Sequence, residues 1–170
     1  LANIGPGAKE AVPTLIDRLR GDGRYSAQRS YRAAYALGKI GKPALPSLFK
    51  ALEENDSRIR SGAAKALGWQ ESDANDTKQI VGKLILILSD DSSNVQDAAA
   101  QSLGAIGKPA VAPLVELLKS SNPDAQWNAS YALGEIGSDA ASAGLALLWL
   151  IESDTEAKIR SEAIHAVARI

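Results

Sequence analysis

A short phrase built on Ala-Leu-Gly recurs through the sequence, and its spacing limits what the chain can fold into. It reads Ala-Leu-Gly-Lys-Ile-Gly at 36–41, Ser-Leu-Gly-Ala-Ile-Gly at 102–107 and Ala-Leu-Gly-Glu-Ile-Gly at 132–137, with weaker copies at 66–69 and 166–170. The central residues of the copies are separated by 30, 36, 30 and 34 positions and are Leu37, Leu67, Leu103, Leu133 and Val167. Such periods indicate repetition of one small unit rather than a single closed core.

The residues that precede each central residue predict an amphipathic helix, termed helix B. Counted from the central residue, positions −8, −4, −1 and +3 share one face when successive residues turn by about 100°. Position −8 is apolar except for Arg29, and position −4 is alanine in every copy. Because small side chains let neighbouring helix axes come close together, we expect this face to lie in the core.

A second helix, termed helix A, is predicted before each helix B. Its apolar residues recur at helical spacing, as at Leu45, Leu48 and Leu52. Prolines are tolerated in a first helical turn and glycines end helices, and both stand where these predictions need them. The prolines are Pro13, Pro43, Pro46, Pro109 and Pro113, and the glycines that follow helix B are Gly41, Gly107 and Gly137.

Two-helix units cannot bury their apolar faces alone, so we predict that they stack. The prediction is one all-α domain over 1–170, a right-handed α-α superhelix (solenoid) of about five two-helix repeats with no β-sheet. The predicted repeats span 6–41, 42–70, 71–107, 108–137 and 138–170, after the end of a truncated repeat at 1–5. Residues 21–25 and 71–76 interrupt the period and are predicted surface loops. Because the chain starts within a repeat, we expect a fragment of a longer solenoid.

The recurring phrase, the proline-opened helix A and the Ile-Arg start of helix B resemble HEAT repeats. That start is seen at Ile59-Arg60 and Ile159-Arg160, and in weaker form at Val95-Gln96. The sequence is most similar to the short HEAT-like subclass named for phycobilisome lyases, over nearly the whole chain. The resemblance implies an α-solenoid but no single function, because the subclass occurs in scaffolds, lyase subunits, hydroxylases and signalling ATPases.

Composition removes several kinds of chemistry. The chain has no cysteine and only one histidine, His165, which excludes disulfides, a thiolate nucleophile and a metal site with several histidines. The paired His-Glu motifs that bind iron in the related hydroxylases are missing, which contradicts that activity. The acidic turns lack the EF-hand spacing, and no glycine-rich phosphate loop is present. We therefore predict no catalytic residue, no cofactor and no metal, and the sequence favours a protein that is not an enzyme.

Two further expectations concern location and ion pairs. The longest strongly apolar run, residues 143–151, is far shorter than a membrane helix. With no signal peptide, we expect no membrane span and a cytoplasmic protein. Arg60 and Arg160 are predicted to pair with the turn carboxylates of Asp56 and Asp154.

The face of helix B opposite the core carries most of the aromatic residues. Positions −6, −2 and +2 lie on or beside this face, and the HEAT resemblance implies that it forms the concave inner surface. Five of the eight aromatic residues fall there: Tyr31, Tyr35, Trp69, Trp127 and Tyr131. We predict that they bind a partner together with Arg32, Lys39 and His165. Two alternatives are that the aromatics bridge neighbouring B helices and that His165 is a solvated surface residue. Trp149 is unusual because it occupies a helix A position that is polar elsewhere.

Charge is uneven along the chain although its net value is −1. Residues 1–85 hold 14 Lys/Arg and 9 Asp/Glu, a net charge of +5, whereas residues 86–170 hold 5 and 11, a net charge of −6. The basic half places Arg24, Arg29, Arg32 and Lys39 beside Tyr31 and Tyr35. This pattern is also consistent with solvated surface charge or with head-to-tail self-association.

Three functions are compatible with the sequence. The first is a non-catalytic scaffold that binds a protein on the concave face. The second, implied by the resemblance alone, is a phycobilin lyase subunit or chaperone in which Tyr31, Arg32 and Tyr35 hold a tetrapyrrole or a tetrapyrrole-bearing protein. The third is a nucleic-acid-binding module that uses the basic half, which the acidic second half disfavours.

Overall fold

The computed structural model describes residues 5–21, 26–153 and 156–170, and these residues form helices and connecting turns without any strand. No helix among them is long and apolar enough to cross a membrane. The α-helices, several of which are preceded by a short 3-10 turn, are α1 (Val12–Leu19), α2 (Ser26–Ile40), α3 (Leu45–Ala51), α4 (Ser57–Gly68), α5 (Ala74–Leu86), α6 (Ser93–Ile106), α7 (Val111–Leu117), α8 (Pro123–Ile136), α9 (Gly144–Glu152) and α10 (Ala157–Arg169).

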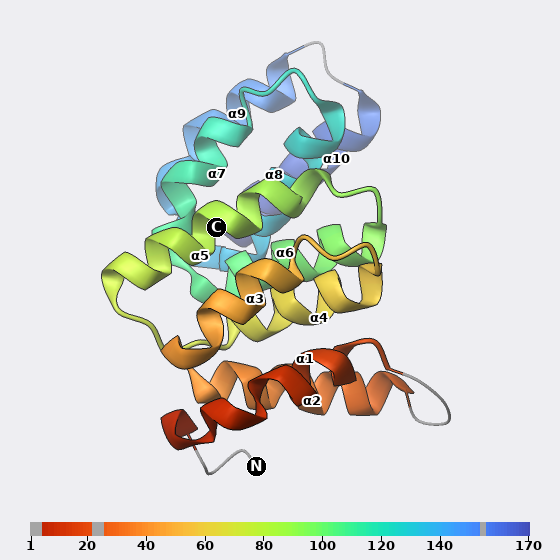
Figure 1. Cartoon of the computed structure of the whole chain (residues 1–170). Coiled ribbons are helices and arrows are strands. Elements are labelled where there is room, and N and C mark those ends of the chain that lie inside the picture. The colour runs from red at the N-terminus through yellow and green to blue at the C-terminus, as the bar shows by residue number, and fades with distance from the viewer. Residues whose placement is uncertain (1–4, 22–25, 154–155) are drawn as a thin grey trace.

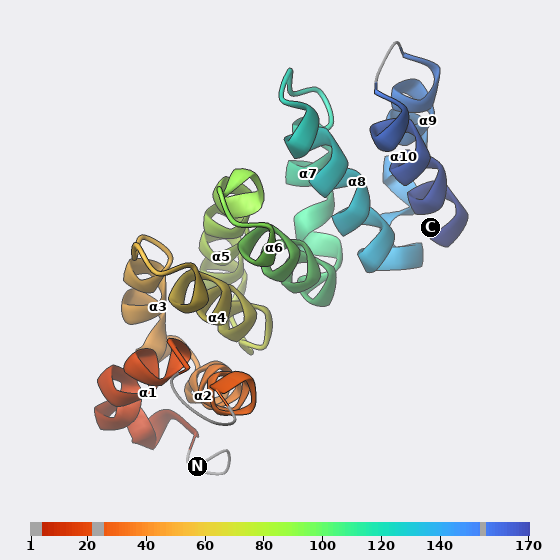
Figure 2. The same ribbon diagram turned by 90° about the vertical axis from the view of Figure 1, so that its right-hand side faces the viewer.

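The helices form two layers along an elongated stack. The odd-numbered helices are the A helices of successive repeats and lie on one side, and the even-numbered B helices lie on the other (Figures 1 and 2). The first repeat, α1 and α2, and the last, α9 and α10, lie at opposite ends of the stack. The predicted all-α solenoid of two-helix repeats is confirmed.

The apolar face of helix B lies in the core, as its spacing predicts. Leu37, Leu67, Leu103 and Leu133 are fully buried, and the alanines at position −4 are at most 4% exposed. Arg29 departs from the prediction, because it is exposed and lines an open pocket beside α1 instead of packing in the core.

The glycine of the recurring phrase marks the closest approach between neighbouring B helices. An added Cβ would stand 2.9 Å from the Cβ of Trp69 at Gly38, 2.7 Å from the Cβ of Ser102 at Gly68 and 2.7 Å from the Cβ of Glu135 at Gly104. The sequence analysis gave a role only to the second glycine of the phrase. These glycines, Gly41, Gly107 and Gly137, end helices with positive φ of 76°, 76° and 70°. The phrase therefore contains one glycine for helix packing and one for the turn.

Capping side chains fix the starts of several helices. The Asp56 side chain accepts a hydrogen bond from the Arg58 N–H, and that of Asn122 accepts from the N–H groups of Asp124 and Ala125. Asp73 caps α5, which begins at Ala74. The predicted loop over 71–76 is therefore wrong for its last three residues, since the capping signal of Asp73 starts the helix earlier than the period implied.

An arginine joins the second and third repeats. Arg60 on α4 donates two hydrogen bonds to Asp90, at 2.7 and 2.8 Å, and a third to Asp91. It also donates to the Glu54 and Asn55 carbonyls of its own turn. The predicted Arg60–Asp56 pair is wrong, because Asp56 lies against Arg58 and Arg20 instead. The predicted partner of Arg160, Asp154, lies outside the described residues.

Substitution of Gly68 tests the close approach of the B helices. We expect Gly68→Ala to destabilise the fold by about 1–3 kcal/mol, because the new methyl group meets the Cα and Cβ of Ser102 at 2.8 and 2.7 Å. Gly82→Ala is the control: Gly82 is exposed inside α5 and nothing lies within 4 Å of its added Cβ. This change should stabilise the helix by roughly 0.5–1 kcal/mol. Urea unfolding followed by circular dichroism measures both, and equal effects would contradict the proposed role of Gly68.

Substitution of Asp90 tests the link between repeats. The Asp90 and Arg60 side chains are 9% and 11% exposed, so Asp90→Asn should destabilise the fold by on the order of 3 kcal/mol at pH 7. Burial acts to raise the pKa of Asp90, but hydrogen bonds from Arg60 and the Ser92 N–H outweigh it and hold that pKa below its ordinary 3.8. Because the pKa of Asp90 is lower in the folded state than in the unfolded state, the ionised carboxylate stabilises the fold at pH values above its unfolded-state pKa. This stabilisation is lost as the pH falls through the folded-state pKa. The difference between wild type and variant should therefore shrink below about pH 4.

The matched control is Asp91→Asn, because Asp91 contacts the same guanidinium group but its side chain is 89% exposed. Its loss should lower stability by less than about 1 kcal/mol. A pH series of thermal unfolding curves compares the two variants. If Asp91→Asn were the more damaging change, the buried Asp90 pair would not be the main link.

Candidate functional site

The residues predicted to bind a partner lie on the solvent-facing side of the B helices, termed the B-helix face. In the first two repeats the aromatics form one cluster. Tyr31 and Tyr35 of α2 are 55% and 38% exposed, and Trp69, which ends α4, is half-buried. The ring centroids of Tyr31 and Tyr35 lie 5.2 and 5.9 Å from that of Trp69 in edge-on arrangements. Because the two tyrosines are one helical turn apart, Trp69 supports both of them.

Lys39 lies at the edge of this cluster. Its Nζ is 3.0 Å from Glu71 Oε1 and 6.0 Å from the centroid of the Tyr35 ring. The hydrogen bond to Glu71 raises the pKa of Lys39, so the ammonium stays charged at neutral pH. Because its charge is already paired with Glu71, Lys39 offers less free positive charge for binding than its position in the sequence implies.

A second aromatic pair lies on α8. Trp127 and Tyr131 stack with centroids 5.6 Å apart and ring planes 19° from parallel, and both are half-buried. His165 is exposed on α10, near Glu162 and Arg169. Burial raises the pKa of Glu162, against the opposing influence of His165 and Arg169. The predicted residues thus form two separate clusters on different repeats rather than one site.

The alternative that the aromatics bridge neighbouring helices holds for part of the set. Trp69 lies between α2 and α4, where its Cβ approaches the position that a side chain on Gly38 would fill. Tyr31 and Tyr35 lean on Trp69 but keep a large exposed surface. One aromatic residue therefore serves as a support, and the two tyrosines offer surface for a contact.

A polar depression of about 430 Å³ opens across α2, α4 and α6, beside the end of α1. Side chains from α4 and α6 form much of its wall, at positions −9, −6 and −2 of each repeat: Arg58, Ser61, Lys65, Asn94, Asp97 and Gln101. The sequence prediction missed Ser61, Lys65, Asn94, Asp97 and Gln101 because it selected aromatic residues, although the same register identifies them.

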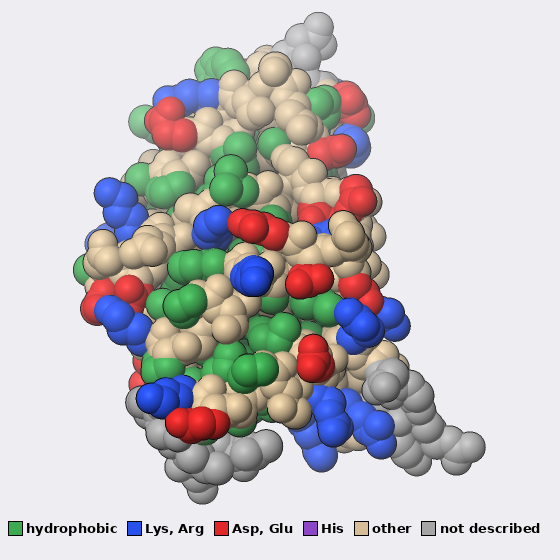
Figure 3. Space-filling model, in the orientation of Figure 1, with side chains coloured by type: hydrophobic (Ala, Val, Ile, Leu, Met, Phe, Trp, Pro, Cys, Tyr) green, Lys and Arg blue, Asp and Glu red, His purple; other side chains and the backbone are tan. Residues whose placement is uncertain are grey.

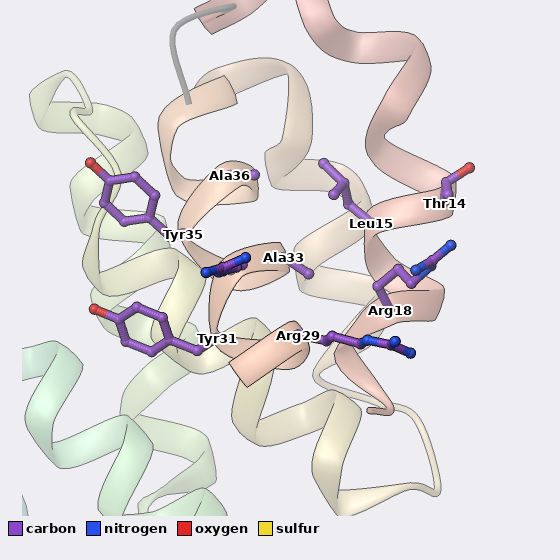
Figure 4. Close-up of a pocket in the computed structure, with 9 residues that line it drawn as sticks. Thr14, Leu15, Arg18, Arg29, Tyr31, Ala33, Tyr35 and Ala36 are labelled. Carbon is purple, nitrogen blue, oxygen red and sulfur yellow. The ribbon is translucent and has the colours of Figure 1, made fainter. Parts of the chain in front are cut away.

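A second pocket, of about 570 Å³, opens between α1 and α2. Leu15, Ala33 and Ala36 give it an apolar wall, and Arg18, Arg29 and Arg32 surround it. Figure 4 shows Tyr31 and Tyr35 projecting from α2 away from α1, whereas Arg29 points toward α1 beside Arg18. Arg32 therefore belongs to this pocket as much as to the aromatic cluster. Arg24, which the sequence placed near these residues, lies outside the described part of the chain.

Elsewhere the surface is mixed. On the side formed by the A helices, basic and acidic side chains are interspersed around apolar patches (Figure 3). Trp149 on α9 is 56% exposed, with Leu145 and Leu148 also exposed on the same helix. Among the described residues, no group of three or more His, Asp or Glu side chains is placed to hold a metal ion.

The different roles of Trp69 and Tyr31 can be separated by stability. Trp69→Ala removes the support of both tyrosines and should destabilise the fold by roughly 2–3 kcal/mol, somewhat less than loss of a fully buried tryptophan. Tyr31→Ala should change stability by no more than about 1 kcal/mol, because most of its ring faces solvent. Urea unfolding of both variants checks this, and a larger effect of Tyr31→Ala would show that the tyrosine, too, is structural.

Comparison with known proteins agrees with this geometry. A family model described as HEAT repeats matches residues 12–82 and 81–168. No curated protein matches the sequence. The complex of CpcE and CpcF of phycocyanin lyase from Nostoc sp. PCC7120 has a similar fold, with a TM-score of 0.62, 20% identity, and coverage of 92% of this chain and 98% of that chain.

A designed armadillo repeat protein in complex with the peptide (KR)4 also matches. Its TM-score is 0.48 at 17% identity, with coverage of 99% of this chain and 87% of that chain. At 20% identity the likeness to the phycocyanin lyase complex describes the fold alone. The family match spans most of the sequence, and its two parts cover the same stacked helix pairs that the geometry reveals. The chain therefore belongs to the HEAT-repeat family.

Proposed function

We propose that this HEAT-repeat chain is a non-catalytic scaffold that binds another protein on its B-helix face. The observation that carries the proposal is the pair of exposed tyrosines, Tyr31 and Tyr35, held in place by the half-buried Trp69. Aromatic side chains dominate the energetics of many protein interfaces, and rigid ones lose little entropy on binding. A surface tyrosine pair that is already ordered is therefore a favourable anchor.

The rest of the face suits a protein better than a small substrate. Trp127 and Tyr131 of α8 provide a second, stacked anchor, and polar side chains of α4 and α6 line a depression on the same side of the molecule. Interfaces typically combine a few aromatic anchors with a polar surround.

Affinity capture from the native lysate tests the proposal. The bait is the wild-type chain beside the variant Tyr31→Ala, Tyr35→Ala, Trp127→Ala, Tyr131→Ala, with circular dichroism to confirm that both fold. We expect one or more proteins that the wild type retains and the variant loses by at least about tenfold, since each central aromatic contributes roughly 2 kcal/mol or more. Because Trp127 and Tyr131 are half-buried, the double variant Tyr31→Ala, Tyr35→Ala is run in parallel.

The matched control is Leu86→Ala, Leu145→Ala, which removes two exposed apolar side chains, 72% and 83% exposed, from the A helices. This variant should retain the partner. Equal retention by the tyrosine variants and the wild type would reject the B-helix face as the binding surface. Loss of the partner in the control alone would move the interface to the A-helix side.

A second candidate function is favoured by the pocket between α1 and α2. Its apolar wall and the guanidinium groups of Arg18, Arg29 and Arg32 suit a flat apolar molecule that carries carboxylates. A linear tetrapyrrole has this chemistry, and the fold resembles that of the phycocyanin lyase complex. Mixing the chain with free bilin should change the visible absorbance spectrum in the wild type. The variant Arg18→Glu, Arg29→Glu, Arg32→Glu should abolish the change, and an unchanged spectrum in the wild type would reject this function.

A further inference from the structure

We infer that this chain self-associates head to tail, with α9 of one copy docked in the pocket between α1 and α2 of the next copy. The inference goes beyond the proposed function, because it concerns the two ends of the stack rather than the B-helix face. It rests on an exposed apolar face of α9, a pocket with a basic rim at the opposite end, and the opposite charges of the two ends.

One face of α9 is both apolar and exposed. Leu145, Leu148 and Trp149 are 83%, 45% and 56% exposed, and the exposed Glu152 stands one turn beyond Leu148. Residues three and four positions apart lie side by side on a helix, so these four side chains form one stripe. The opposite face of α9 is apolar too and lies in the core, as at Leu147. A helix that is apolar all round is typically buried, so the stripe fits a surface that another protein covers.

A further repeat stacked at the usual spacing does not suit this end of the molecule. In the other B helices position +1 is glycine and position −3 is a fully buried small residue, namely Ala34, Ala64, Ala100 and Ser130. On α10 these positions hold Ala168 and Ile164, and Ile164 is 50% exposed. Because even an added Cβ at Gly68 stands 2.7 Å from the Cβ of Ser102, the larger side chains prevent the same close approach. The cover of α9 therefore packs differently from a following B helix.

The pocket between α1 and α2 belongs to the opposite end of the stack (Figures 2 and 4). Position −5 of a B helix faces the preceding repeat, as at Gly62, where an added Cβ would stand 2.9 Å from Leu19 of α1. On α2 this position is the exposed Arg32, which lines the pocket. The volume of about 570 Å³ and the apolar wall can receive an indole or a leucine side chain. A docked helix would exclude the small molecule considered above for the same pocket.

The charges of the two ends are complementary. Residues 1–41 hold 7 Lys/Arg and 3 Asp/Glu, a net charge of +4, whereas residues 138–170 hold 3 and 5, a net charge of −2. Arg18, Arg29 and Arg32 surround the pocket, and none of them forms an ion pair with a described residue. Glu152, at the end of the apolar stripe, is likewise unpaired within the described part of the chain. A carboxylate that meets guanidinium groups at the rim of an apolar contact favours pairing of unlike ends.

Analytical ultracentrifugation of the wild-type chain is the first arm of the test. The contact joins one helix to one pocket, and interfaces of this small size associate weakly. We therefore expect the average mass to rise at least about twofold between about 10 µM and about 500 µM protein at low salt. Added salt should reduce the association, because part of it is electrostatic. An average mass that stays at that of one chain over this range overturns the inference.

Two variants, each of which disables one surface, are the second arm. Arg18→Glu, Arg29→Glu reverses the charge of the pocket rim, and Leu145→Ala, Trp149→Ala removes most of the apolar stripe. All four side chains are exposed, so both variants should fold, which circular dichroism checks. Each variant alone should remain monomeric at concentrations at which the wild type associates. An equimolar mixture should form dimers and nothing larger, because the intact α9 of the first variant can enter only the intact pocket of the second.

The matched control is Lys50→Glu, Lys108→Glu, which makes the same change in net charge at exposed lysines of α3 and of the turn before α7. It should associate like the wild type. Dimers of the Arg18→Glu, Arg29→Glu variant alone would reveal a symmetric contact between two α9 helices and overturn the head-to-tail arrangement. A mixture of the two variants that stays monomeric would overturn the pocket as the docking site. Both variants keep the exposed tyrosine pair, so either result leaves the proposed function of the B-helix face untouched.

Discussion

The close approach of neighbouring B helices is the constraint on which the rest of the structure depends. Gly68 meets Ser102 and Gly104 meets Glu135 so closely that even a methyl group would not fit without movement. Alanine at position −4 and a buried leucine at the centre then fill the remaining space, as at Ala63 and Leu67. Because this contact recurs between successive repeats, it also fixes the register of the opposite face. Residues at the same position of successive B helices therefore form rows across the solvent-facing surface.

The same register brings charges from adjacent repeats together. Arg60 reaches Asp90, Lys83 reaches Glu53, and Lys158 reaches Asp124, each about one period away along the chain. Buried polar groups follow the same pattern: Ser102 donates to the Ala64 carbonyl and Asn128 donates to the Leu88 carbonyl. Pairing between repeats therefore neutralises part of the charge that the sequence shows in each half.

Periodicity allowed the fold to be predicted, because the same face must be buried in every repeat and an error in one copy is corrected by the others. Details that depend on contacts between repeats could not be predicted in this way. Arg60 was assigned to Asp56, four residues away, but the guanidinium group reaches the following turn, where two carboxylates converge. Arg29 occupies a core register yet lies beside an open pocket, since register alone does not say whether a neighbouring helix covers a position.

The candidate site shows the same limit. Periodicity placed the aromatic residues on one face, but it could not separate Trp69, which fills space between α2 and α4, from Tyr31 and Tyr35, which rest on it and face solvent. The two roles are linked, because the tyrosines are ordered only as far as the tryptophan is held by the contact at Gly38. Under the proposed function, a change that loosens the first two repeats should therefore weaken binding without altering any residue that touches the partner. Affinity on the B-helix face would then depend on the spacing of the repeats beneath it.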